Sequence, residues 1–474
     1  MTTAELTQAE ATQERLPGTS RIYAPGGRFR LYKLTYVLAA AGIATVWGGI
    51  SGILLPFQIQ GLEFANVFGQ NSGVDLQQLT TLKAAIAAGT ATATTEQQQQ
   101  LGLLSQYEAA RAASLGIVTA VSIAVSMFVG PVAGALSDRT RTRWGRRTPF
   151  IVAGAVLGAA LLVATRYSPT VAALLLLFTM AQVALGLAPG ALNATVPDRV
   201  PAHKIGGMSG IAGFGTLLGM TLGTVIGGFM FASLGMDAYF PFVLVAIVLP
   251  LLFVTISRDR SSTDLVVPPF SWKRFLLSFT VAVRDRDFRW LLIAKLVMYF
   301  GYSISTAFGI YMLQSYIQPA LSAEEAARTV PLLTLAGLPG MVVALLAAGW
   351  WSDRIGKRKP IVIGASLLFA ASLTVPFVSP TLPALFCQAV LGSLAMGAFL
   401  TVDQAYFIDL LPDRTAAARD LGVSAFGQNI GQAAGPAVAG IIVATSGSYQ
   451  IVWVVAFAAV LIAAAAVIPI RRAP

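Results

Sequence analysis

Long apolar runs, separated by short polar stretches, dominate the chain. A helix that crosses a bilayer needs about 20 mainly apolar residues, and twelve runs of this kind are present. They lie near residues 34–57, 112–136, 149–166, 170–196, 205–233, 239–257, 289–313, 329–351, 360–379, 383–409, 420–445 and 449–469. The pattern therefore predicts an all-α polytopic membrane protein with twelve transmembrane helices.

One polar connection divides these runs into six and six. Residues 258–288 contain Pro268-Pro269 and alternating charges, and they form the only long connection in the middle of the chain. We expect a cytosolic tail (1–29), an N-terminal six-helix bundle (30–257), a cytosolic linker (258–288) and a C-terminal six-helix bundle (289–470).

A second long connection covers about residues 58–110, between the first two runs. Within it, Leu101, Leu104 and Tyr107 share the spacing of one helical face, which predicts a short helix before the second span. Long loops are often functional or mobile. The sequence favours a spacer here over a binding lid, and leaves both readings open.

The basic residues set the orientation. If the connections alternate sides, 27 of the 32 Lys and Arg residues lie on the side of the two chain ends, four lie on the other side, and Lys295 lies inside a span. Cytosolic loops of membrane proteins carry such an excess, so both termini are expected to be cytosolic. Topology accounts for the net charge of +11 without a nucleic-acid partner.

Composition excludes several kinds of site. Hydrophobic residues make up 56% of the chain and charged residues 11%, whereas a soluble domain usually has about 25% charged residues. A single cysteine, Cys387, excludes an intrachain disulfide and a cysteine-built metal site. A single histidine, His203, excludes a histidine metal cluster or histidine proton relay.

Two halves of the chain repeat each other. The triplet Ser137-Asp138-Arg139 recurs as Ser352-Asp353-Arg354, 215 residues later, and each copy lies in a basic loop between apolar runs. Pro197-Asp198-Arg199 recurs as Pro412-Asp413-Arg414 at the same offset. A repeat of this kind is typical of transporters built from duplicated bundles.

Glycines recur every fourth residue in two of the runs. They are Gly215, Gly219, Gly223 and Gly227 in the fifth run, and Gly427, Gly431 and Gly435 in the eleventh. Glycines on one helical face allow two backbones to approach closely. We expect close helix packing, and a smooth face of this kind could also be a sliding surface between the two halves.

The basic loops carry a family resemblance. Their motif residues are Gly134, Asp138, Arg139, Gly145, Arg146 and Arg147 in the first copy, and Gly349, Asp353, Arg354, Gly356, Lys357 and Arg358 in the second. The two copies resemble the signature of the major facilitator superfamily. The first copy, which continues as Thr148-Pro149-Phe150, is similar to the sugar–cation symporter branch that includes plant sucrose–proton symporters.

The resemblance implies that the two loops hold the cytosolic gate of a transporter, and that spans 1, 4, 7 and 10 line its central cavity. One feature departs from the plant branch, whose members carry an acid and an arginine within span 4. Between Arg166 and Asp198 this chain has no charged residue. The acid and the arginine of the plant branch are therefore absent from this span.

Two charges lie inside predicted spans. Lys295 is six residues from Arg289, and Asp403 is six residues from Asp409, so both lie about 9 Å from the cytosolic ends of their helices. Charges within a membrane are costly and are candidates for function. Because the resemblance places spans 7 and 10 at the cavity, we predict a Lys295–Asp403 ion pair at the cavity wall, either as the proton-coupling site or as a static structural pair.

Polar and aromatic side chains of the spans are candidates for the substrate cavity. They are Trp47, Ser51, Gln58, Gln182, Asn193, Tyr299, Tyr302, Gln388, Gln404, Gln428, Asn429 and Gln432. Amides and hydroxyls both donate and accept hydrogen bonds, and sugar C–H faces pack on aromatic rings. This set favours a neutral, polyhydroxylated ligand, although each of these residues could equally join two helices.

The sequence thus predicts a secondary transporter of a sugar or glycoside, by proton-coupled symport and alternating access. It needs no bound cofactor, because a proton or sodium gradient supplies the energy. The alternatives are a proton-driven multidrug or metabolite exporter, and a sensor that lost transport; a nucleotide loop or nucleophile–base set of an enzyme is not found. We expect a monomer in the plasma membrane, with the lipid bilayer and a small solute as its partners and no nucleic acid.

Overall fold

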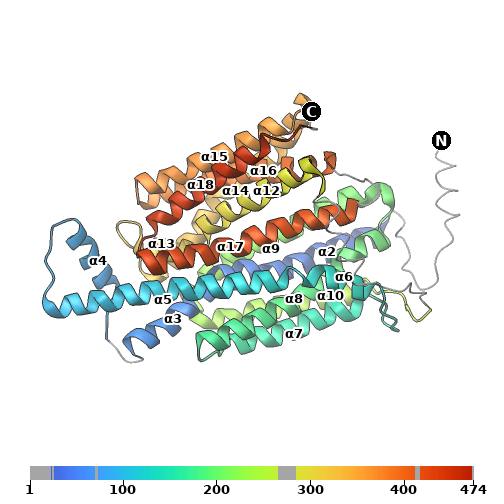
Figure 1. Ribbon diagram of the computed structural model, residues 1–474. Helices are drawn as coiled ribbons and strands as arrows, with labels where there is room; N and C mark the ends of the chain where they lie inside the picture. The colour runs from blue at the N-terminus through green and yellow to red at the C-terminus, as the bar shows by residue number, and fades with distance from the viewer. Residues whose placement is uncertain (1–22, 24–25, 70–72, 265–283, 411–416, 472–474) are drawn as a thin grey trace.

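The protein is a bundle of long helices. The computed structural model describes residues 23, 26–69, 73–264, 284–410 and 417–471, and every regular element in these ranges is a helix. Figure 1 shows the helices running roughly side by side along one long direction, with α4 at one end and α6 toward the other. We call these the α4 end and the α6 end.

The first group of helices comes from the N-terminal half of the chain. It contains α2 (Gly27–Thr45), η1 (Val46–Leu54), α3 (Leu55–Phe68), α4 (Leu76–Ala87), α5 (Thr95–Ser126), α6 (Val129–Ser137), α7 (Thr148–Arg166), α8 (Val171–Arg199), η2 (Ala202–Lys204), α9 (Ile205–Leu234), η3 (Gly235–Ala238) and α10 (Tyr239–Ile256). We refer to it as the N-terminal group.

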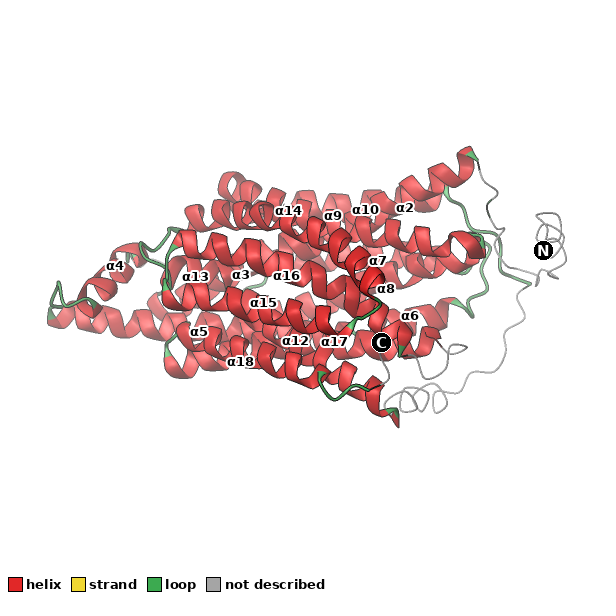
Figure 2. Cartoon of the chain, turned by 90° about the horizontal axis from the view of Figure 1, so that it is seen from above, coloured by secondary structure: helices red, strands yellow, loops and turns green. Residues whose placement is uncertain are grey.

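The C-terminal group follows after the linker, whose residues 265–283 lie outside the described part. It contains α12 (Arg286–Thr306), α13 (Gly309–Ser315), α14 (Ala323–Ile355), α15 (Lys359–Val378), α16 (Leu382–Asp409), α17 (Ala417–Ser446) and α18 (Gln450–Val467). The groups meet where α5 packs against α17 and where α9 packs against α14. Figure 2 shows the same bundle from above.

The apolar lengths of these helices fit a membrane. Nine stretches of the described residues are long and apolar enough to cross it, or ten if α12 and α13, which meet at an angle of 41°, form one span. One of the nine, Ile205–Ile256, contains two helices, α9 and α10. The prediction of an all-α polytopic membrane protein is confirmed.

The connection predicted over residues 58–110 is more helical than expected. The helix of the first run continues to Phe68, α4 follows, and α5 begins at Thr95 and runs without a break into the second span. Thr94 accepts a hydrogen bond from the backbone N–H of Gln97, whose side chain accepts one from the backbone N–H of Thr94, and this capping box fixes the start of α5. Leu104 and Tyr107 then bury their side chains against Leu79 of α4.

The glycine faces pack within each group and not between them. Gly219 and Gly223 of α9 lie against the backbone of α2, at Ala41 and Thr45, and Gly431 lies against Leu296 of α12. A side chain at any of these glycines would meet backbone atoms, so close packing explains the pattern. The prediction that these faces form a sliding surface between the two halves is therefore wrong.

Other small residues form the close contacts between the groups. Gly116 of α5 lies against the backbone of Pro436 and Gly440 in α17, and Gly228 of α9 lies against Ala327 and Pro331 in α14. Gly228 lies near the end of α9, whereas Gly116 lies in the second half of α5. At both positions the backbones of the two groups approach each other closely.

Candidate functional site

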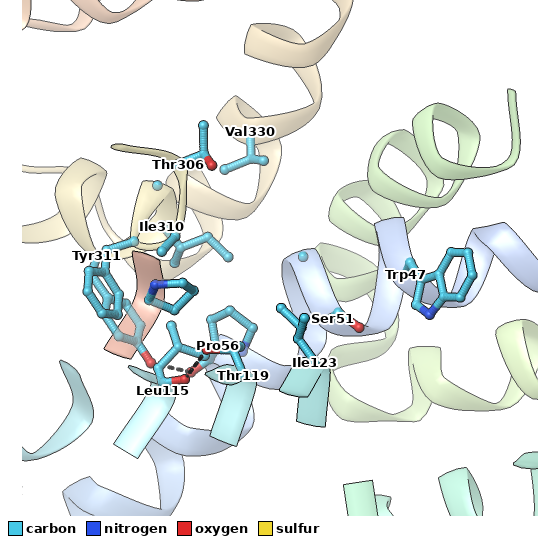
Figure 3. A pocket seen from close by; sticks show the side chains of 15 residues that line it. Trp47, Ser51, Pro56, Leu115, Thr119, Ile123, Thr306, Ile310, Tyr311 and Val330 are labelled. Atoms are coloured by element: carbon cyan, nitrogen blue, oxygen red, sulfur yellow. Dashed lines mark hydrogen bonds between the residues drawn. The ribbon is translucent and has the colours of Figure 1, made fainter. Parts of the chain in front are cut away.

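A central cavity lies between the two groups of helices. Its volume is about 260 Å³, and all fifteen of its lining residues are uncharged. They are Trp47, Ser51, Gly52, Pro56, Leu115, Thr119, Ile123, Thr306, Ala307, Phe308, Gly309, Ile310, Tyr311, Val330 and Pro436. Figure 3 shows Trp47 and Ser51 on one side of the cavity, and Thr306, Ile310 and Tyr311 on the other. The cavity can thus hold a small neutral molecule in contact with both groups.

A π-helical segment shapes the N-terminal side of the cavity. The wide turn η1 joins α2 to α3, and it carries Trp47 and Ser51. The sequence favours this wide turn because Pro56 has no N–H to bond to the carbonyl of Gly52. Gly48 lies so close to the backbone of Met220 that no side chain would fit there. π-helical turns within α-helices are often found at functional sites.

The polar groups on this side of the cavity form a short network. The indole N–H of Trp47 donates to Oε1 of Gln182 at 3.0 Å, and Nε2 of Gln182 donates to the hydroxyl of Ser51 at 3.2 Å. The amide of Gln182 thereby holds both cavity side chains in place from α8. This network contains three of the residues predicted for the substrate cavity.

A cluster of polar contacts joins the groups on the α4 side of the cavity. We call its members Pro56, Gln60, Arg111, Tyr311, Gln314 and Ser315 the inter-group cluster. The hydroxyl of Tyr311 donates to the carbonyl of Pro56 at 3.0 Å, and Nε2 of Gln60 donates to Oε1 of Gln314. Because Pro56 and Tyr311 also line the cavity, the cluster closes it toward the α4 end.

Arg111 is the central residue of this cluster. Its guanidinium donates to Oε1 of Gln314 at 3.2 Å and to the hydroxyl of Ser315 at 2.6 Å, both in the C-terminal group. The rings of Tyr107 and Tyr311 lie 5.1 and 4.6 Å from it, within the range of cation–π attraction. Only 3% of Arg111 is exposed. A buried cation of the N-terminal group is thus held by neutral groups of the other.

The structure brings Lys295 and Asp403 together. Nζ of Lys295 lies 2.9 Å from Oδ2 of Asp403 and donates to the hydroxyl of Ser424 at 3.0 Å. The ring of Phe407 lies 4.9 Å from the ammonium group, and both charged residues are buried. The other carboxylate oxygen, Oδ1 of Asp403, has no hydrogen-bond partner. α12, α16 and α17 therefore build a charged site with one oxygen unsatisfied.

The position of this pair differs from the prediction. Lys295 and Asp403 are not among the residues that line the central cavity. Their side chains turn into the contact between α12, α16 and α17, where Ser424 supplies a further hydrogen-bond acceptor. The pair belongs to the C-terminal group alone, and the cavity wall is therefore the wrong place for it.

The first copy of the loop motif forms a dense network at the α6 end. Arg147 contacts Asp138 at 2.6 Å, Asp198 at 3.0 Å and the hydroxyl of Ser137 at 2.6 Å. Arg146 pairs with the same Asp198, and Gly145 takes a φ of +88°, which favours glycine. Asp138, at the end of α6, is thereby tied to the start of α7 and the end of α8.

One further acid, Asp259, joins the network from the segment just after α10. The backbone N–H of Arg147 donates to Asp259, which also pairs with Arg199 at 3.3 Å. The carbonyl of Gly134 lies 3.5 Å from the Arg147 guanidinium. The backbone N–H of Arg139 donates to the carbonyl of Leu136 at 3.1 Å. The motif residues of the first copy thus connect α6, α7, α8 and α10 within the N-terminal group.

The second copy repeats the core of this arrangement. Arg358 donates to the hydroxyl of Ser352 at 2.7 Å, as Arg147 does to Ser137, and lies 3.2 Å from Asp409. Gly356 ends α14 with a φ of +67°, and Arg354 lies over the ring of Trp350. Gly349 packs against Thr401, and Lys357 is exposed. The side chain of Asp353 and the second Pro412-Asp413-Arg414 lie outside the described residues.

Several predicted cavity residues instead join helices. Gln58 donates to the carbonyl of Thr165 and accepts from the hydroxyl of Tyr239, and Asn193 accepts from the hydroxyl of Tyr36 at 2.6 Å. These contacts lie inside the N-terminal group. Gln58 and Asn193 were therefore wrong as cavity residues, because an amide in a span satisfies a neighbouring helix as readily as a ligand.

The C-terminal candidates also lie away from the cavity lining. The ring of Tyr299 packs near Lys295, and that of Tyr302 packs on Phe369. Gln404 is exposed, and Gln388 lies at Gly392 of its own helix. The remaining candidates, on α17, are partly buried without lining the cavity: Gln428, Asn429 and Gln432. Their assignment to the cavity was wrong in this structure.

The C-terminal side of the cavity comes from a feature that the pattern did not reveal. The break between α12 and α13 places Thr306 to Tyr311 around the cavity. The second span adds Leu115, Thr119 and Ile123. A glycine at 309 within an apolar run was the available signal for the break. Arg111, a single cation at the start of an apolar run, was the signal for the inter-group cluster.

Known proteins match this chain at the levels of sequence and fold. The family described as MFS/sugar transport protein matches residues 104–470. Multidrug resistance protein MdtG of Escherichia coli O9:H4 (strain HS) is 25% identical over 298 residues, which cover 62% of this chain and 69% of MdtG.

Two solved structures share the fold. The nucleoside transporter NupG has a TM-score of 0.63 at 14% identity, with 93% of this chain and 98% of that chain covered. The human organic anion transporter MFSD10 (TETRAN) has a TM-score of 0.59 at 16% identity, with 94% and 100% covered. Three observations lead to one conclusion about the family: the long apolar helices, the duplicated loop motif and a family match over most of the length. The chain is therefore a multi-pass integral membrane protein of the major facilitator superfamily, in the family of MFS/sugar transport proteins.

Proposed function

We propose that the protein is a secondary active transporter of a small neutral polar solute, of the sugar or glycoside class. It works by alternating access, as a proton-coupled symporter in the plasma membrane. An ion gradient is its energy source, and one chain is the working unit.

The proposal includes twelve spans in two six-helix bundles, 30–257 and 289–470. Two observations support this number beyond the nine or ten apolar stretches: α9 and α10 share one stretch, and α17, 30 residues long, lies outside the set. The first motif loop and its basic residues lie at the α6 end, so the excess of positive charge assigns that end to the cytosol. The α4 end then faces outward.

The uncharged central cavity is the observation that carries the substrate class. An anionic solute would require buried cations in the lining, and the lining has none among its fifteen residues. Trp47 offers an aromatic face, and Ser51, Thr119 and Thr306 offer hydroxyls. At about 260 Å³ the cavity lies below the 300–1,000 Å³ typical of drug-sized ligands. This size suits a small solute better than a large amphipathic one.

Asp403 is the group that we assign to coupling. Its Oδ1 atom is unsatisfied within a buried site, whereas Lys295 balances the other oxygen. Protonation of the carboxylate would remove the charge that compensates Lys295, because Lys295 would then be a buried cation with a neutral partner. Proton binding can thereby favour one arrangement of α12 and α16 over another, and this difference in affinity drives a transport cycle.

The decisive experiment is uptake into proteoliposomes. Labelled sucrose, maltose, trehalose and glucose would be offered with and without an inward proton gradient. We expect the gradient to stimulate uptake of one of these sugars. If none of them moves under a proton or a sodium gradient, the sugar assignment falls.

A proton-driven exporter is the second candidate. The observations that favour it are the apolar residues that make up most of the cavity lining and the similarity to MdtG, which is named a multidrug resistance protein. Fluorescent amphipathic cations loaded into the same vesicles distinguish the two functions. Their proton-dependent movement, without movement of any sugar, would establish the exporter.

A further inference from the structure

A second cavity lies on the other side of the inter-group cluster. Its volume is about 340 Å³, and it is bounded by α3, α4, α5, the end of α13 and the segment that follows α13. Gln60, Arg111, Gln314 and Ser315 line it, together with Tyr107 and Glu108. The cluster therefore separates this outer cavity from the central one. The connection over 58–110 supplies its far wall through α4.

Two charged side chains in the outer cavity each have one unsatisfied atom. Oε1 of Glu108 and Nε of Arg111 are buried without a hydrogen-bond partner, and the two residues are 5% and 3% exposed. The other oxygen of Glu108 pairs with Lys83 of α4 at 2.6 Å. The terminal nitrogens of Arg111 donate to Gln314 and Ser315. One acceptor and one donor thus lack a partner within the same cavity.

The spacing of these residues puts both atoms on one face. Glu108 and Arg111 are three positions apart on α5, so their side chains are neighbours on the helix surface. A hydroxyl group both donates and accepts a hydrogen bond. It could donate to the Glu108 carboxylate and accept from the Arg111 Nε–H. The ring of Tyr107 in the same lining supplies an apolar face for C–H groups.

We propose that the outer cavity is a second binding site, which takes a polyhydroxylated solute before it reaches the central cavity. The assignment of sugars to this site rests on the proposed function, whereas the pocket and its unsatisfied atoms do not. Arg111 and Gln314 belong both to this site and to the contacts that close the central cavity. A solute bound here is thus in direct contact with the groups that must separate for it to enter.

Protection of a single cysteine tests the site. Thr80 lines the outer cavity, and Thr80→Cys in a Cys387→Ser background of the full chain in nanodiscs gives one reactive thiol. Its rate of labelling by a charged maleimide would be measured with increasing sucrose, maltose, trehalose or glucose. We expect one of these sugars to slow labelling at least fivefold, in a saturable manner.

Substitutions on α5 show where the protecting sugar binds. Glu108→Gln should raise the sugar concentration for half-protection roughly tenfold, because hydrogen bonds to a charged group are the stronger ones. Glu96→Gln, on the same helix but exposed, should leave it unchanged. Arg111→Lys provides a second variant if Glu108→Gln does not elute as folded protein. It keeps the charge and removes the Nε–H, and the same loss is expected.

The outcomes separate this inference from the proposed function. The outer site is overturned if none of the four sugars protects the thiol. It is also overturned if Glu108→Gln and Arg111→Lys both leave the half-protecting sugar concentration unchanged from that of the protein without these substitutions. Either result holds even if the uptake experiment succeeds. Protection that depends on Glu108 supports the outer site, even if the uptake experiment shows no transport. Failure of both experiments refutes both proposals.

Discussion

Two buried cations of this protein differ in how their contacts relate to the two groups of helices. Lys295 has its carboxylate partner, Asp403, at 2.9 Å within the C-terminal group. Arg111 belongs to the N-terminal group, and its hydrogen bonds reach Gln314 and Ser315 of the other group. A rearrangement of the two groups can leave the first site intact but must break the second.

This difference indicates which buried charge suits proton coupling and which suits closure of the cavity. A buried ion pair is costly to break, because the remaining charge is left without compensation. Such a pair suits a site that changes only when a proton arrives. Neutral partners hold an arginine less firmly, and they can be exchanged for water or a ligand when the groups separate. We therefore assign coupling to the Lys295–Asp403 pair, and closure of the α4 side to Arg111.

The largest effect is expected for Asp403→Asn. The substitution leaves Lys295 buried without its counter-charge, a change that costs about 3–5 kcal/mol in other buried pairs. We expect uptake driven by a proton gradient to fall at least about 100-fold, since 2.7 kcal/mol corresponds to that factor. Labelled-sugar uptake into proteoliposomes measures this loss.

Sugar exchange at equilibrium separates coupling from structure. A variant that has lost only the proton site still exchanges labelled for unlabelled sugar without a gradient, whereas a misfolded one does not. Glu96→Gln, which removes an exposed acid, is the matched control and should transport as the unmodified protein does. Unchanged gradient-driven uptake in Asp403→Asn would reduce the pair to a structural role.

A smaller effect is expected for Arg111→Gln. The variant loses charge-assisted hydrogen bonds between the groups, each worth about 1.5–3 kcal/mol. The population open at the α4 end should rise roughly tenfold or more. Thr119→Cys in the Cys387→Ser background reports this population, because Thr119 lines the central cavity and a membrane-impermeant maleimide reaches it from the α4 side only when the cluster opens.

Arg328→Gln supplies the control for this experiment. Arg328 lies in the first turns of α14 at the α4 end, and its side chain is exposed. The control removes the same charge from the same end of the protein without touching the cluster. Equal labelling rates in Arg111→Gln and Arg328→Gln would contradict a closing role for Arg111.

The two loop motifs extend the comparison to contacts within a group. The side chain of Arg147 is 4% exposed and pairs with Asp138 and Asp198, whereas the side chain of Arg358 is 20% exposed and pairs with Asp409. Arg147→Ala should cost about 3 kcal/mol of stability and Arg358→Ala less than about 1 kcal/mol, because solvent screens the more exposed pair. Thermal unfolding in detergent would rank them. A larger loss of stability in Arg358→Ala than in Arg147→Ala would show that burial does not determine the stabilities of these two ion pairs.

The sequence predicted features that depend on chain-wide regularities. Apolar length revealed the membrane class, and the 215-residue repeat located both motif loops. The structure added the contact between Ser137 and Arg147, which recurs between Ser352 and Arg358. The ion pair could be predicted because charges within spans are rare and each needs a partner. Helical rise then placed Lys295 and Asp403 at one level.

The sequence could not predict the direction in which the polar side chains of the spans point. Gln58 and Gln182 look alike in an apolar run, yet the first satisfies the carbonyl of Thr165 and the second supports Trp47 and Ser51. The difference depends on the rotation of each helix, which a π-helical turn in the first span alters. The contacts of Arg111 depend on the break between α12 and α13, a tertiary feature that hydrophobic periodicity does not encode.

The smallest effect is expected for Trp47→Phe, which tests the cavity without touching either cation. The phenyl ring keeps the apolar face but cannot donate to Oε1 of Gln182, a neutral hydrogen bond worth about 1 kcal/mol. We expect KM for sugar uptake to rise about fivefold. Because the hydrogen bond of Trp47 to Gln182 lies within the N-terminal group, labelling of Thr119→Cys from the α4 side should not change. A change in labelling comparable to that of Arg111→Gln would mean that the cavity and its closure are one coupled unit, and that the division between sites within a group and sites between groups does not hold.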